Sequence, residues 1–137
     1  MTGRVLVDTG PIVAMMLESD EHHQACVEQL RQITGPLMTC WPVITEAVWL
    51  LRAYPKAIRR LLSSFQGRPF ELVSLGEADL PAVSTILAKY DDLGLQLADA
   101  ALVHLANREG IEMLFTLDRR DFGVVRLAGG RNLRLIP

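Results

Sequence analysis

The sequence contains few cysteines and no long apolar run. Its two cysteines, Cys26 and Cys40, lie among apolar neighbours and have neither disulfide-framework nor metal-ligand spacing. This pattern predicts reduced, structural thiols in a cytosolic protein. The apolar residues before Asp8 are too few for a secretory signal, and no apolar run is long enough to span a bilayer. We therefore expect a cytoplasmic protein with no membrane partner.

Lysine is also scarce, since Lys56 and Lys89 are the only lysines among 14 basic residues. Arginine forms bidentate contacts with phosphate that lysine cannot form, which is compatible with nucleic-acid binding. GC-rich codon usage explains the same bias equally well. The formal net charge of −2 excludes a uniformly basic nucleic-acid-binding protein. It does not exclude a nuclease, because an acidic metal pocket can lie inside a basic rim.

The chain is long enough for one domain, and strands alternate with helices along it. Half of the 137 residues are hydrophobic, which is sufficient for a core. Apolar runs predict strands at 4–7, 37–39, 70–73 and 111–115, with short edge strands at 124–125 and 133–136. Helical periodicity predicts helices at 11–17, 21–33, 78–90 and 96–108. It also predicts a helix that starts at 42 and breaks at 54–55, followed by another that runs to 65. This order predicts an α/β fold with a mostly parallel sheet of four to five strands and helices on both faces.

Four acidic residues stand out because each lies in an otherwise apolar segment or directly after a strand. Asp8 and Asp118 follow predicted strands, Glu46 is the only charged residue between 39 and 51, and Asp99 is a single acid at the start of a helix. Parallel sheets place their sites beyond the carboxyl ends of the strands. Carboxylates gathered there would repel one another unless a cation were bound. Oxygen ligands indicate Mg²⁺ or Mn²⁺ in preference to zinc.

Each acid also has a structural explanation. Asp8 can cap the helix at Pro11, although Thr9 can do so instead. Glu46 can pair with Arg52, six residues away. Asp99 can be an ordinary acid in the first turn of a helix, and an acid such as Asp118 is common in a loop after a strand.

Considered together, the four segments resemble the PIN-domain ribonuclease family, and within it the VapC-like toxins of bacterial and archaeal toxin–antitoxin pairs. The matching segments are VLVDTGP at 5–11, TEA at 45–47, LADAALV at 97–103 and FTLDRRDF at 115–122. They cover essentially the whole chain and occur in the family's order.

The resemblance implies that residues 1–137 form one PIN-like nuclease domain with an active site at Asp8, Glu46, Asp99 and Asp118. Thr116 resembles the accessory hydroxyl of the family. We expect Asp8 and Asp99 to be the principal ligands of Mg²⁺ or Mn²⁺, with Glu46 and Asp118 completing the site. The implied function is a metal-dependent endoribonuclease, the toxin of a toxin–antitoxin pair that inhibits translation. RNA as substrate, a cognate antitoxin and a homodimer are the implied partners.

Other functions remain open at this stage. A housekeeping PIN-domain nuclease in RNA processing would use the same chemistry. A non-catalytic metal- or RNA-binding module would pair its acids with arginines. A phosphoacceptor receiver domain is disfavoured, because Asp8 has no acidic neighbour and both lysines lie on helical segments. We expect Trp41 and Trp49 to pack in the core or against a partner in preference to stacking on bases, and His104 to be half-buried and hydrogen-bonded.

Overall fold

A five-stranded sheet forms the centre of the computed structural model, which describes residues 3–137. The first two residues of the predicted domain lie outside the described part. The strands are β1 (Val5–Val7), β2 (Leu37–Thr39), β3 (Phe70–Leu72), β4 (Met113–Phe115) and β5 (Arg134–Ile136). Their order is β3-β2-β1-β4-β5, and each neighbouring pair is parallel. The predicted parallel sheet is therefore confirmed, with the fully buried β1 at its centre.

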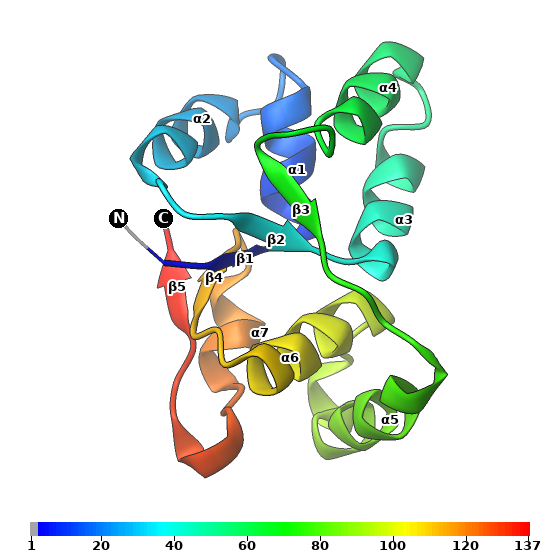
Figure 1. Ribbon diagram of the computed structural model, residues 1–137, viewed down its shortest axis with the longest axis vertical. Coiled ribbons are helices and arrows are strands. Elements are labelled where there is room, and N and C mark those ends of the chain that lie inside the picture. Colours follow the sequence, from blue (N-terminus) through cyan, green and yellow to red (C-terminus); the bar gives the residue numbers. More distant parts are fainter. Residues whose placement is uncertain (1–2) are drawn as a thin grey trace.

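Helices cover both faces of this sheet. They are α1 (Thr9–Met16), α2 (His23–Gln32), α3 (Trp41–Leu50), α4 (Pro55–Ser63), α5 (Leu80–Lys89), α6 (Leu97–Glu109) and α7 (Arg119–Val124). Helices α1 to α4 lie on one side of the sheet, and α5 to α7 lie on the other (Figure 1). Within residues 3–137, no helix combines the length and the apolar character needed to cross a bilayer.

Proline and glycine define several helix ends, as the sequence predicts. Pro42 and Pro55 lie in the first turns of α3 and α4, where a missing backbone N–H costs nothing. Helix α6 ends at Gly110, whose φ of 67° is in the left-handed region that glycine adopts easily. Its N–H donates to the carbonyl of Ala106 and closes the helix.

The predicted edge strand at 124–125 is wrong. Val124 is the last residue of α7, and only an isolated antiparallel bridge between Arg126 and Asn132 forms in this region. A helix forms instead because Asp118 caps it, accepting a hydrogen bond from the N–H of Asp121 at 3.0 Å. Phe122 and Val125, three residues apart, are both buried, which anchors one face of the segment in the core.

Helix α6 is largely buried, and polar contacts hold its C-terminal half. Seven of its residues are buried, so Asp99 belongs to a largely apolar helix. Farther along, His104 Nε2 lies 2.7 Å from Asp79 Oδ1, and Arg108 donates to the same oxygen at 3.0 Å. These contacts hold the pKa of Asp79 well below its usual value. His104 is half-buried and hydrogen-bonded, as predicted, and α6 is fixed against the segment that precedes α5.

Candidate active site

Asp8 lies at the carboxyl end of the central strand and is almost completely buried. Its backbone N–H donates to the carbonyl of Phe115 on the neighbouring strand β4 at 2.9 Å. Its carboxylate accepts from the N–H of Thr9 at 2.8 Å, so Asp8 is the N-cap of α1 and the alternative that Thr9 replaces it is wrong. Burial raises the pKa of Asp8 to about 6, against the opposing effect of its hydrogen bonds. The charges of Asp99 and Glu46 add to the increase.

Thr116 connects the first and the last of the four predicted acids. Its hydroxyl donates to Asp8 Oδ2 at 2.8 Å and accepts from the backbone N–H of Asp118 at 3.0 Å. Thr116 is itself buried, immediately after β4. The predicted accessory hydroxyl therefore orients the carboxylate of Asp8 and fixes the backbone at Asp118.

Glu46 and Asp99 reach the same region from two helices that contact each other, α3 and α6. Burial raises the pKa of Glu46, and the charge of Asp99 raises it further. Burial also raises the pKa of Asp99, whose carboxylate accepts from the N–H of Gln96 at 2.9 Å. Asp99 thus caps its helix while its charge acts on both Asp8 and Glu46. The alternative explanation of Glu46, a pairing with Arg52, does not occur among the ion pairs of residues 3–137.

The charge of Asp118 acts on Asp99, and so does the charge of Asp121, an acid that the sequence did not place in the site. The charges of Asp118 and Asp121 both raise the pKa of Asp99. Asp121 lies in the first turn of α7, three residues after Asp118. That i, i+3 spacing was the signal in the sequence that could have indicated it. It was missed because the sequence predicted no helix at this position.

The charges of the acids act on one another, but the side chains do not form a complete metal-binding site. In the described part of the chain, no group of three or more His, Cys, Asp or Glu side chains is placed to hold a metal ion. Mg²⁺ retains several waters and is commonly held by only one or two carboxylates. The donors are all carboxylate oxygens, and burial and mutual repulsion raise the pKa values of Asp8, Glu46 and Asp99, so the set is suited to a hydrated divalent cation.

Thr116→Val should lower the free energy of unfolding by about 1–3 kcal/mol. The substitution leaves the buried Asp8 carboxylate without one of its donors and the N–H of Asp118 without its acceptor. Urea denaturation at pH 7.5 measures the effect. Thr116→Ser keeps the hydroxyl and should remain near wild type, as should Thr85→Val at an exposed threonine of α5. Equal stability of Thr116→Val and wild type would contradict the role assigned to this hydroxyl.

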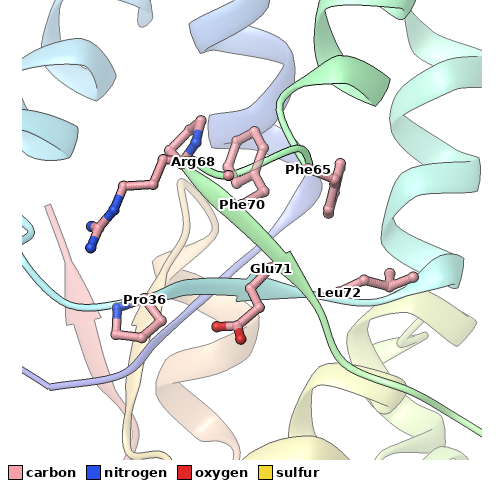
Figure 2. Close-up of a pocket in the computed structure, with 8 residues that line it drawn as sticks. Pro36, Phe65, Arg68, Phe70, Glu71 and Leu72 are labelled. Atoms are coloured by element: carbon pink, nitrogen blue, oxygen red, sulfur yellow. The ribbon is translucent and has the colours of Figure 1, made fainter.

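A shallow groove adjoins the acids. It has a volume of about 440 Å³ and is lined by Trp41, Pro42, Thr45, Glu46, Trp49 and Leu97. A separate pocket lies at the edge strand β3, lined by residues that include Arg68, Phe70 and Glu71 (Figure 2). None of the predicted acids lines that second pocket. Of these two, the groove along α3 shares Glu46 with the acidic site.

The chain is similar to several known proteins. The PIN domain family matches residues 5–127. Ribonuclease VapC26 of Mycobacterium tuberculosis is 30% identical over 135 residues, which are 97% of this chain and 100% of that protein. The crystal structure of Mycobacterium tuberculosis VapC20, a Sarcin-Ricin loop cleaving toxin, has a TM-score of 0.79 at 16% identity and covers 87% of this chain and 93% of that one.

A second solved structure, VapBC2 from Rickettsia felis bound to a DNA fragment from their promoter, has a TM-score of 0.66 at 14% identity. It covers 98% of this chain and 100% of the other. At these identities the two structures establish the shared fold, while the family match and the 30% identity establish kinship. The resemblance found in the four sequence segments is confirmed, and the chain belongs to the PIN-domain family.

Proposed function

We propose that this protein is a metal-dependent endoribonuclease and the toxin of a toxin–antitoxin pair. Its family and its 30% identity to a ribonuclease support the enzyme class. The observation that carries the proposal is the electrostatic coupling of Asp8, Glu46 and Asp99 at the carboxyl end of β1. Three acids with raised pKa values in one place are unfavourable for stability, which is typical of a functional site.

We assign the divalent ion to Asp8 and Asp99, with Glu46 and Asp118 completing the site through waters or directly. When bound, Mg²⁺ or Mn²⁺ activates water as the nucleophile and neutralises charge on the phosphate and the leaving oxygen. The protein holds the two principal carboxylates in place. Thr116 and the N–H of Thr9 orient Asp8, and the N–H of Gln96 orients Asp99. Orientation before binding reduces the entropy lost when the ion and the RNA arrive.

Thr9 adds a polar atom at the same place. Its side chain is 3% exposed, and Oγ1 has no hydrogen-bond partner among residues 3–137. The hydroxyl nevertheless lies near enough to Glu46 to oppose the increase in that residue's pKa. A buried hydroxyl without a partner is costly, so we assign it to a water or a carboxylate of the loaded site.

The partners follow from the same proposal. The antitoxin is a protein encoded beside the toxin that covers the acidic site, and two toxin chains form a homodimer. Action on RNA in the cytoplasm accounts for inhibition of translation. A small reading frame next to this gene supports the toxin role over RNA processing, and its absence supports RNA processing.

Metal removal tests the enzyme class. The purified chain should cleave RNA with Mn²⁺, lose all cleavage when EDTA is in excess, and regain it when Mn²⁺ is restored. Gel analysis of a labelled RNA measures the rate, and sequencing of RNA ends after induced expression identifies the target. Cleavage that continues in EDTA would exclude the metal mechanism.

A further inference from the structure

The short turn between β4 and α7 carries two residues of the candidate site, and one strand holds both of its ends. Thr116 begins the turn directly after β4, and Asp118 ends it as the N-cap of α7. The N–H of Thr116 donates to the carbonyl of Ile136 at 2.9 Å, which pairs the start of the turn with the edge strand β5 (Figure 1). The other end is held by Arg119, the first residue of α7.

The side chain of Arg119 binds main-chain oxygens of β5 that the sheet does not use. Its Nη2 donates to the oxygen of Leu135 at 3.3 Å and also to the oxygen of Pro137. Between these two residues, the carbonyl of Ile136 is the one that accepts from the β4 side. An edge strand leaves its other carbonyls without partners in the sheet, so Arg119 satisfies oxygens on the open edge of β5.

Three consecutive main-chain oxygens of β5 and the residue after it therefore fix the turn from both sides. Asp118 lies between the two fixed points, and its own N–H donates to Thr116 Oγ1 at 3.0 Å. A carboxylate on a restrained backbone loses less conformational freedom when it binds an ion. Residues that orient a metal ligand in this way influence the affinity for the metal without touching it.

The next residue, Arg120, lacks these contacts. It is exposed in the same first turn of α7, and it forms no hydrogen bond or ion pair within residues 3–137. Two arginines of equal charge thus lie side by side in the sequence, and only Arg119 is connected to β5. The contact with β5, and not the positive charge, is what distinguishes them.

We infer that Arg119 is a positioning residue that ties the turn carrying Asp118 to strand β5. The inference rests on the proposed metal site and adds to it a residue that touches neither the ion nor the RNA. Strand β5 lies outside residues 5–127, the part of the chain that the PIN domain family matches. Direct contact of Arg119 with a phosphate of the RNA is the rival role, and that role would not depend on β5.

Arg119→Met and Arg120→Met are matched variants, because each removes one positive charge from the same turn and only the first removes a contact with β5. Calorimetric titration with Mn²⁺ should show about 10-fold weaker binding by Arg119→Met, the scale on which a residue that orients a metal ligand acts. Arg120→Met should bind Mn²⁺ as wild type does. Arg119→Lys keeps a charged donor and should recover part of the loss.

Hydrogen exchange and kinetics separate positioning from RNA binding. The N–H of Asp118 should exchange faster in Arg119→Met than in Arg120→Met, because the turn opens more often when its second end is released. For RNA cleavage, Arg119→Met should lower kcat about 10-fold. It should leave KM unchanged, since the residue does not contact the substrate.

Equal Mn²⁺ affinity and equal exchange at Asp118 in the two methionine variants would overturn the inference. A raised KM for RNA in Arg119→Met, with Mn²⁺ affinity unchanged, would assign Arg119 to the substrate instead. If wild type binds Mn²⁺ but cleaves no RNA, the proposed ribonuclease function is wrong. Weaker Mn²⁺ binding by Arg119→Met alone would in that case still uphold the positioning role.

Discussion

Asp99→Asn should reduce the rate of RNA cleavage at least about 100-fold, the scale on which removal of one preorganised electrostatic group acts. Asp99 is the acid whose charge reaches both Asp8 and Glu46, and Asp118 and Asp121 act on it in turn. Its neutralisation therefore removes the central charge of the proposed metal site. The asparagine oxygen can still accept from the N–H of Gln96, so the cap of α6 is retained.

The fold of this variant should be as stable as wild type or more stable, because repulsion among the acids is reduced. Single-turnover cleavage with Mn²⁺ gives the rate, and calorimetric titration with Mn²⁺ gives the affinity for the metal independently of activity. Asp92→Asn removes an exposed charge shortly before α6 and should leave both unchanged. Wild-type cleavage by Asp99→Asn would show that the acids are assigned wrongly.

The second large effect is on stability, which should decrease as pH rises in the metal-free protein. The pKa of Asp8 is 3.8 in the unfolded chain and about 6 in the folded one, so the folded state binds this proton more tightly. Stability is highest below the lower value and decreases as pH rises through the higher one. The total for Asp8 is about 3 kcal/mol. About half of it, about 1.5 kcal/mol, should be lost between pH 5 and pH 7.5.

Urea denaturation at pH 5 and pH 7.5 measures this dependence. The lowered pKa of Asp79 acts in the opposite direction, but its contribution is lost only in more acidic solution, below the chosen range. Asp8→Asn should remove the part of the pH dependence that Asp8 contributes, while Glu46 and Asp99, whose pKa values are also raised, still act in the same direction. Mn²⁺ should stabilise wild type more at pH 7.5 than at pH 5, because the protonated carboxyl is a poor ligand. Stability that rises between pH 5 and pH 7.5 in the absence of metal would contradict the buried, raised pKa of Asp8.

The positions of the acids relative to the strands could be predicted from the sequence, because strand ends follow from local patterns. Asp8 directly follows a buried apolar run, and in a parallel sheet this position places Asp8 at the carboxyl edge. The hydroxyl of Thr116 was found through the family's motif, but its double hydrogen bond depends on the pairing of β1 with β4, which no local pattern encodes.

Other features depended on tertiary contacts and were missed for that reason. Helix α7 was predicted as a loop and a strand, because two adjacent valines favour a strand and the cap at Asp118 was not recognised. The role of Asp121 was missed with it. The exposure of Trp49 was also unpredictable, since α3 is apolar on several faces and the sequence does not show which face meets the core.

The central strand has a consequence for synthesis. Asp8 is translated well before the hydroxyl that orients it, which lies 108 residues later, on the loop after β4. Contacts so distant along the chain cannot form until most of the polypeptide has left the ribosome. A nascent chain therefore has no assembled acidic centre until Thr116 has left the ribosome, and the ribosome that produces this protein is not exposed to a working nuclease before that point.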